Sequence, residues 1–314
     1  MAPLKQFLWV EAYRPQTIDD CILPKDIKNT AKAFVAQGDL PNMILAGPPG
    51  TGKTTLAMAM CRELGVTTMF INASEESGID VLRTKIKDFA AALSLDGKRK
   101  YVILDEADFL NPNSTQPGLR AMMEEFAVNC GFLLTCNYGE KIIPALHSRC
   151  ASISLAIPQK ERVALKTQTL DRLKKMLDTE RIAYDEDVLV NVIKANWPDL
   201  RKMITLIQIA SANGELSPSV LAQHGDIQFD GLWKAIRSRN YKDARTWIGQ
   251  NADVNPAKFY RSVFDWLHET AEENTLPTLI VLTADYQYRH ITAVDSQVHL
   301  SAYVLELMNH GQYK

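Results

Sequence analysis

Apolar residues in the first half of the chain form short runs that alternate with helical patterns. Five runs of four or five residues are closed by turn or polar residues, as is typical of buried β-strands, and they cover residues 43–46, 69–72, 101–104, 132–136 and 152–155. Apolar positions at helical spacing lie between them, in residues 54–64, 81–93 and 119–126. Alternating strands and helices imply crossover connections. We therefore predict an α/β domain whose parallel sheet carries helices on both faces.

The strands stop near residue 155, and the patterns that follow are helical. In the next part they cover residues 161–180, 186–196 and 200–212, with Pro218 opening a short last helix. A Gly-Asp turn at residues 225–226 precedes a third part, which is again helical and is interrupted at 251–256, 274–277 and 293–296. We therefore predict three domains, an α/β domain followed by two all-α domains, with bounds 1–155, 156–225 and 226–314.

Residues 47–54 read Gly-Pro-Pro-Gly-Thr-Gly-Lys-Thr, which matches the phosphate-loop pattern G-x-x-x-x-G-K-[ST]. The string lies directly after a predicted strand and directly before a predicted helix, which is the context that the pattern requires. Its glycines let backbone N–H groups turn toward phosphates at the positive end of the helix. Lys53 would reach the β- and γ-phosphates, and the Thr54 hydroxyl would bind Mg²⁺.

Polar side chains end two further predicted strands. Asp105 and Glu106 follow the strand at 101–104, where Asp105 would hold Mg²⁺ and Glu106 would orient and polarise the attacking water. Asn137 ends the strand at 132–136 and could hydrogen-bond the γ-phosphate or that water. The alternatives are a solvated acidic turn and an ordinary turn asparagine. Together with the phosphate loop, these residues predict hydrolysis of a nucleoside triphosphate.

Composition excludes several classes of protein. With 35 Lys and Arg against 37 Asp and Glu, the net charge is −2, so the chain is neither a globally basic nucleic-acid binder nor an acidic tail protein. Apolar stretches fall well short of a membrane span, and residues 1–10 are too short for a signal peptide. The 5 cysteines are odd in number and lack C-x-x-C spacing, which indicates reduced thiols and no zinc site. We therefore expect a cytoplasmic protein.

A local basic patch is the one candidate for nucleic-acid contact. Arg83 and Lys87 are four residues apart on one face of a predicted helix. Residues 79–100 carry six basic and three acidic side chains. An ordinary solvated helix face is the alternative interpretation.

The order of these motifs resembles that of an AAA+ ATPase. The phosphate loop is followed by Asp105-Glu-Ala-Asp108, Asn137, Ser148-Arg149-Cys150 and Pro198-Asp-Leu-Arg201. More narrowly, the chain resembles the clamp loaders, the family of the replication-factor-C small subunits and their phage counterparts. The strings that carry this narrower resemblance span almost the whole chain and begin at Trp9, Asn72 and Asp285. Residues 17–24 resemble the large subunits of T-even-type phages within that family.

The resemblance implies an AAA+ core, a helical lid over 156–225 and an oligomerisation collar over 226–314. It implies ATP and Mg²⁺ as cofactors. Arg201 would reach the γ-phosphate from the lid, and Arg149 would be an arginine finger that acts in trans, in the site of a neighbouring subunit. The implied nucleotide contacts are Val10, Glu11, Ala12, Tyr13 and Ile22 at adenine and ribose, and Gly50, Thr51, Gly52, Lys53, Thr54 and Thr55 at the phosphates.

The resemblance also implies DNA contacts, at Arg83, Lys87, Gln116 and Arg120. The family pattern L-R-R-x-M-E reads Leu-Arg-Ala-Met-Met-Glu at 119–124, so Ala121 stands where the family has its second arginine. Phosphate contacts carry no base information, so recognition would be of primer–template shape.

The implied activity is the loading of a ring-shaped sliding clamp onto primer–template DNA, with hydrolysis of ATP releasing the clamp. Its partners would be the clamp, DNA, copies of this chain in a pentamer with a distinct small subunit, and indirectly a DNA polymerase; for a phage protein the compartment would be the host cytoplasm. Two alternatives stay open: a non-hydrolysing scaffold subunit of a loader, and another AAA+ DNA motor of the branch-migration type.

Overall fold

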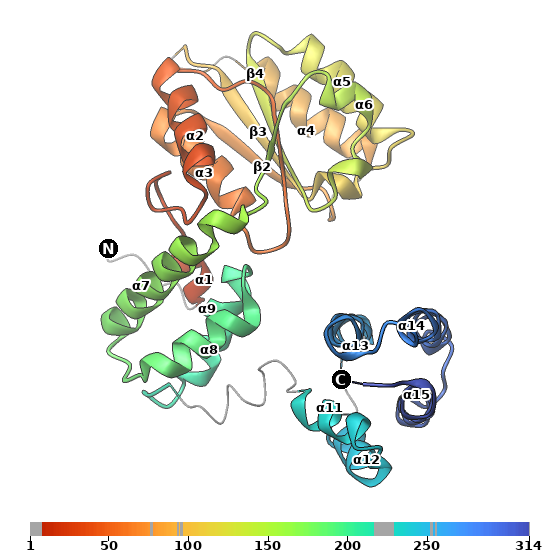
Figure 1. Ribbon diagram of the computed structural model, residues 1–314. Helices are drawn as coiled ribbons and strands as arrows, with labels where there is room; N and C mark the ends of the chain where they lie inside the picture. The colour runs from red at the N-terminus through yellow and green to blue at the C-terminus, as the bar shows by residue number, and fades with distance from the viewer. Residues whose placement is uncertain are drawn as a thin grey trace. The chain divides into compact units, whose positions relative to one another are not determined.

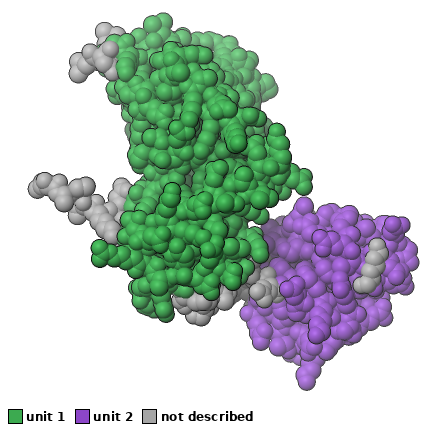
Figure 2. Space-filling model, turned by 60° about the vertical axis from the view of Figure 1, so that its left-hand side comes forward, with its two compact units in different colours: residues 1–225 green, residues 226–314 purple. Residues whose placement is uncertain are grey.

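The computed structural model describes the chain except for residues 1–7, 76–77, 93, 95–96, 217–228, 252–253, 255 and 314. The chain forms two compact units, residues 1–225 and 226–314 (Figure 2). The finer division of unit 1 at residue 155 and the assignment of three domains stay predictions. Among the described residues, no helix is both long enough and apolar enough to cross a membrane.

The first unit contains a five-stranded sheet of order β2-β3-β4-β1-β5, in which every recorded pair is parallel. The strands are β1 (Met43–Ala46), β2 (Thr68–Asn72), β3 (Lys100–Asp105), β4 (Cys130–Cys136) and β5 (Ala151–Ser154). All five predicted strands are present, and their bounds shift by at most two residues. Strands β2, β3 and β4 extend past the apolar runs, and β5 begins and ends one residue earlier than predicted.

Helices cover both faces of this sheet (Figure 1). One face carries α2 (Lys25–Gln37) and α3 (Lys53–Leu64), and the other carries α4 (Ile79–Ala91), α5 (Thr115–Glu125) and the short α6 (Pro144–His147). Alternate side chains of the central strands β1, β3 and β4 enter different cores, whereas the edge strands β2 and β5 each contribute to one core and expose residues of the other face. Val102 and Leu104 of β3 pack with α4 and α5, whereas Tyr101 and Ile103 pack with α2 and α3. The prediction of a parallel sheet between two helical layers is confirmed.

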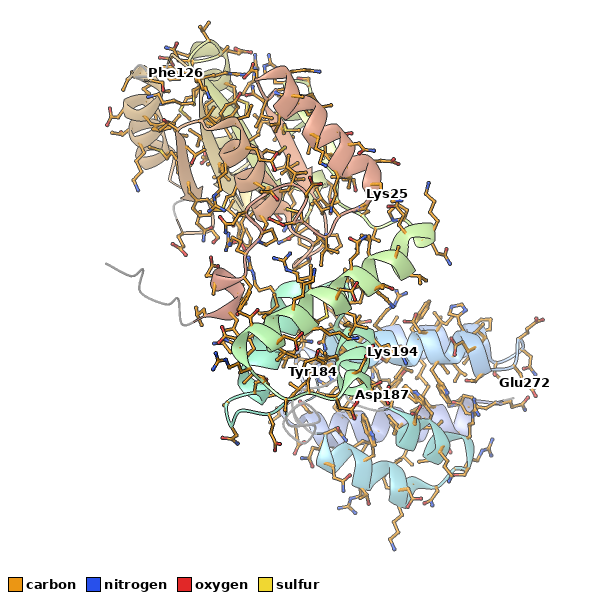
Figure 3. All side chains as sticks on the ribbon, turned by 90° about the vertical axis from the view of Figure 1, so that its left-hand side faces the viewer. Lys25, Phe126, Tyr184, Asp187, Lys194 and Glu272 are labelled. Carbon is orange, nitrogen blue, oxygen red and sulfur yellow. The ribbon has the colours of Figure 1, made fainter. Side chains whose placement is uncertain are left out.

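Three further helices follow in the same unit: α7 (Arg162–Glu180), α8 (Glu186–Asn196) and α9 (Leu200–Ala210). They enclose a separate apolar core that includes Leu173, Leu189 and Ile207. Asp185 and Asp199 cap α8 and α9 by accepting backbone N–H groups of the first turn. In Figure 3, Lys25 marks the start of α2, where its N–H donates to Glu161 Oε2 at 2.9 Å, just before α7.

Three short 3₁₀ turns connect these elements: η1 (Ala107–Phe109), η2 (Gly139–Lys141) and η3 (Gln159–Glu161). The one-turn helix α1 (Trp9–Ala12) packs on α9 (Figure 1). Helices α1, α2 and α6 are absent from the sequence prediction. Helices α1 and α6 span only four residues each, whereas α2 carries Ile27, Ala31, Phe34 and Val35 at helical spacing, a signal that the prediction overlooked. The helix expected at Pro218 lies outside the described residues.

The second unit is helical, as predicted. Its described helices are α11 (Asp230–Arg237), α12 (Tyr241–Gln250), α13 (Pro256–Thr270), α14 (Leu276–His290) and α15 (Ser296–His310). They share a core rich in aromatic rings. Phe259 and Tyr303 are fully buried, and Trp233 stacks on Trp266 with ring centroids 4.7 Å apart. The aromatic positions at helical spacing therefore serve first to hold this unit together.

Gly131 of β4 permits close packing against Tyr101, its partner residue on β3. A Cβ at this position would lie 2.4 Å from Tyr101 Cε1. The Tyr101 side chain is 0% exposed, and its hydroxyl donates to Asp39 and accepts the Leu40 N–H at 2.8 Å. Because the ring is buried and its hydroxyl is fixed by two hydrogen bonds, the ring cannot move aside for a larger residue.

Replacement of Gly131 should therefore destabilise the first unit. We expect Gly131→Ala to lower the free energy of unfolding by about 2 kcal/mol, which urea denaturation measures. Gly249→Ala in α12 is the control, because a Cβ there meets nothing within 4 Å. Equal stability of the two variants would contradict the steric account.

Candidate active site

One pocket of the first unit lies where β1, β3 and β4 end and the lid helices begin. The loop after β1 carries Gly50 and Gly52 with φ of +72° and +90°, a left-handed conformation that glycine adopts without strain. The helix α3 begins directly afterwards, so its free N–H groups face this loop. The pocket is lined by Val10, Tyr13, Arg14, Pro15, Cys21, Ile22, Leu23, Pro49, Gly50, Thr51, Gly52, Lys53, Thr54, Thr55, Asp105, Glu106, Thr135, Cys136, Asn137, Arg172, Leu200, Arg201 and Ile204.

The Lys53 ammonium lies inside the phosphate loop. Its Nζ donates to the carbonyls of Gly47 and Pro48 at 2.8 and 2.9 Å and to Asn137 Oδ1 at 2.8 Å. Burial lowers the pKa of Lys53, and the charge of Asp105 opposes that shift. A buried cation whose hydrogen-bond partners are all uncharged is well placed to attract phosphate oxygens. The structure thus brings Lys53 and Asn137 together, as the sequence predicts.

A second cluster of oxygen atoms surrounds Asp105. The hydroxyls of Thr54 and Thr135 donate to Asp105 Oδ1 at 2.6 and 2.5 Å. Hydroxyl and carboxylate oxygens are the ligand types that Mg²⁺ prefers, so Thr54 and Asp105 fit the predicted metal site. Thr135 is a site residue that the sequence analysis missed. The only signal for it is a polar residue inside the apolar run of β4.

Glu106 lies beside this cluster in a left-handed backbone conformation, with φ of +57°. Its N–H donates to Thr135 Oγ1 at 3.2 Å, which holds the turn in place. A non-glycine residue rarely adopts this conformation, and such residues concentrate at functional sites. This backbone conformation fixes the direction in which the Glu106 side chain projects from the end of β3.

Asp108 also supports the site without lining it. Its side chain is 8% exposed, and its Oδ2 accepts the N–H groups of Asn137 and Tyr138, each at 3.3 Å. The fourth residue of the Asp-Glu-Ala-Asp string therefore fixes the main chain that carries Asn137. The sequence alone indicates no role for Asp108, because its hydrogen-bond partners lie about 30 residues further along the chain.

The far end of the pocket, away from the phosphate loop, is largely apolar, and three of the five residues predicted there line it. Val10, Tyr13 and Ile22 line the pocket, but Glu11 and Ala12 do not. In a helical turn, residues three apart share a face, so α1 presents Val10 and Tyr13 together and turns the two residues between them away. Glu11 instead forms an ion pair with Arg14.

The lid contacts the phosphate loop directly. The N–H of Leu200, the first residue of α9, donates to the carbonyl of Gly50 at 3.3 Å. Arg201 follows immediately and lines the same pocket. A second lid arginine, Arg172 of α7, lines it as well and was missed by the sequence analysis.

Arg149 is not among the residues that line this pocket. Its Nε donates to Glu124 Oε1 at 2.6 Å, and its Nη1 donates to the Ala145 carbonyl at 3.0 Å. The hydrogen bond from Arg149 lowers the pKa of the Glu124 carboxyl. The guanidinium is thus held outside its own nucleotide site, and its trans role stays a prediction.

Three of the four predicted DNA contacts lie at the surface, and the fourth, Gln116, is buried. Arg83, Lys87 and Arg120 lie at least partly exposed on α4 and α5, where Lys87 Nζ is 3.5 Å from Glu125 and Arg120 Nε is 3.5 Å from Glu124.

Gln116 is a correction to these contacts. Its side chain is 0% exposed, and its amide donates to the Leu110 and Lys141 carbonyls at 3.0 Å and accepts the Ile143 N–H at 2.8 Å. This side chain ties three segments together inside the core, so it cannot contact DNA. Its side of α5 faces the core rather than the solvent.

The pairing of Thr54 with Asp105 leads to a test of the metal site. Thr54→Val keeps the shape and removes the hydroxyl, so ATP binding in Mg²⁺ should weaken by about tenfold or more, while binding in EDTA should change little. Titration calorimetry measures both. Thr54→Ser should retain the Mg²⁺ effect, and Thr30→Val, an equal change at an exposed position of α2 outside the pocket, is the control. A full Mg²⁺ effect in Thr54→Val would contradict the assignment.

Comparison with known proteins shows the family of this chain. The family described as "ATPase family associated with various cellular activities (AAA)" matches residues 43–156. The sliding-clamp-loader large subunit of Enterobacteria phage T4 is 31% identical over 99% of this chain and 98% of its own length. A replication factor C small subunit of Saccharolobus solfataricus is 32% identical over 98% of this chain and 96% of its own length. A solved variant of RuvB from Thermotoga maritima, with a TM-score of 0.56 at 16% identity over 97% of this chain and 91% of that chain, shows the fold alone. The chain therefore belongs to the clamp-loader family of AAA ATPases, together with the replication factor C small subunits and the phage sliding-clamp-loader large subunits.

Proposed function

We propose that this chain is an ATP-hydrolysing subunit of a sliding-clamp loader. With other subunits it binds and opens a ring-shaped clamp, places the clamp on primer–template DNA and hydrolyses ATP to release it, which supports processive replication. One observation carries the hydrolytic part: Lys53, Thr54, Asp105, Glu106 and Asn137 all line one pocket. The full-length similarity to clamp-loader subunits supports the rest.

The residues of the pocket have separate roles in hydrolysis. The N–H groups of the loop and of the start of α3, together with Lys53, bind the phosphates and stabilise the charge that develops on them. Glu106 orients the attacking water and accepts its proton, and Asn137 positions the water or the γ-phosphate. Mg²⁺ held by Thr54 and Asp105 would add charge neutralisation at the phosphates.

Partners follow from the same proposal. Arg83, Lys87 and Arg120 contact DNA phosphates without reading bases. The complex is a pentamer in which residues 226–314 form a collar and Arg149 completes the site of a neighbouring subunit. It contains copies of this chain and a distinct small subunit, and it serves a DNA polymerase indirectly, in the cytoplasm of a cell or of a phage host.

Two other functions are less consistent with the site. A scaffold subunit without hydrolysis would not need Lys53, Asp105 and Glu106 in the pocket. Against a branch-migration motor stands the similarity to clamp-loader subunits, at 31% and 32% identity over almost the whole chain. DNA unwinding by this chain without a clamp would favour the motor.

Glu106 provides the test of hydrolysis. Glu106→Gln keeps the size of the side chain and removes the base, so ATP should still bind while turnover in the presence of clamp and DNA falls by about a hundredfold or more. Phosphate release measures turnover, and filter binding measures ATP. Glu273→Gln, an exposed residue of the second unit, is the control. Unchanged turnover in Glu106→Gln would refute the enzyme assignment.

Arg149 is tested by complementation between two inactive chains. Arg149→Ala assemblies and Glu106→Gln assemblies should each lose about a hundredfold or more of the activity, since removing a finger or a base has at least that effect. Mixed assemblies should regain activity, because an intact Glu106 in an Arg149→Ala chain can receive Arg149 from a Glu106→Gln neighbour. A finger that acts within its own chain predicts no recovery on mixing.

A further inference from the structure

The segment that leads into the nucleotide pocket is attached to two different hydrophobic cores. Trp9, Val10 and Tyr13 pack against the core of the lid, whereas Ile18 and Cys21 are buried in the core between the sheet and α3. Further bonds strengthen each attachment. The Tyr13 hydroxyl donates to Glu180 on α7 at 2.7 Å, and the Ile18 N–H donates to Glu63 on α3 at 2.6 Å.

The base end of the pocket therefore has a wall with two independent supports. Val10 and Tyr13 come from the part held by the lid, and Ile22 and Leu23 come from the part held by the sheet domain. A flat base can be bound between them only when both parts keep a fixed separation. Apolar packing alone leaves this separation free, because each part packs against its own core.

Arg172 of α7 connects the two parts. Its Nη2 donates to the Tyr13 carbonyl at 2.6 Å, and its Nη1 donates to the Asp20 carbonyl at 2.7 Å. Burial lowers the pKa of the guanidinium, and the nearby Asp20 charge opposes that shift. Two short bonds from one planar, charged group fix both distance and orientation, which a lysine ammonium cannot do.

We propose that Arg172 is a positioning residue that holds the base-binding wall of the nucleotide pocket. It thereby provides the part of the affinity for ATP that comes from the adenosine group and not from the phosphates. This inference rests on the proposed function and adds a residue to the same site. Arg172 acts through the main chain at Tyr13 and Asp20 and not on the phosphates, which Lys53 and the loop hold at the other end of the pocket. Its loss should weaken binding of the adenosine part alone.

The test compares ATP with inorganic triphosphate, which lacks base and ribose. In Arg172→Gln, the dissociation constant and the KM for ATP should rise by about ten- to a hundredfold, the effect of losing bonds to a charged group, while kcat at saturating ATP stays within about twofold. The dissociation constant for inorganic triphosphate, measured by competition in Mg²⁺, should not change. Arg172→Lys should behave like Arg172→Gln, because charge without the planar fork does not restore both bonds.

Arg162→Gln is the matched control, since it removes the same charge from an exposed position of the same helix. Circular dichroism of each variant reports folding, and if Arg172→Gln is unfolded, Arg172→Lys decides the question. Wild-type ATP affinity in the folded variants, or an equal loss for ATP and inorganic triphosphate, would overturn the proposal. Failure of the wild-type assembly to hydrolyse ATP in the presence of clamp and DNA would instead refute the proposed function.

Discussion

Parallel pairing of β3, β4 and β1 determines where the groups of the nucleotide site lie. Because the three strands are neighbours in the order β3-β4-β1 and run in one direction, their carboxyl ends meet at one edge of the sheet. Asp105 ends β3, Asn137 follows β4 and the phosphate loop follows β1. Each strand is buried on both faces, so a slip of one residue would exchange the side chains of the two cores. The core thus protects the register on which the site depends.

Polar contacts at this edge then refine the positions that the strands provide. Thr135 bonds both Asp105 and the N–H of Glu106, so one hydroxyl connects the carboxylate of the predicted metal site with the residue proposed as the catalytic base. Asp108 fixes the main chain after β4 by accepting the N–H groups of Asn137 and Tyr138. Such supporting groups restrict the site to one geometry before any ligand is bound, which lowers the reorganisation needed during reaction.

Basic side chains that are predicted to contact DNA are paired with carboxylates, so the chain is nearly neutral overall and still exposes cations. Lys87 and Arg120, two of the predicted DNA contacts, are paired with Glu125 and Glu124. Arg149 shares Glu124 with Arg120. Ion pairs at exposed positions contribute little to stability, so phosphate oxygens can replace these carboxylates at small cost. The net charge of −2 is therefore compatible with local binding of DNA.

Local sequence patterns were enough to predict the alternation of strands and helices, the phosphate loop, the acidic strand end and the family, because each of the motifs involved consists of neighbouring residues. Only the tertiary structure revealed Thr135 and Arg172, since their partners lie 30 and 159 residues away along the chain. It also reversed the assignment of Gln116, whose polar side chain indicates exposure although three backbone groups satisfy it in the core. Hydrogen bonds between distant segments leave no periodic signal, whereas burial of an apolar face leaves one at every turn or every second residue.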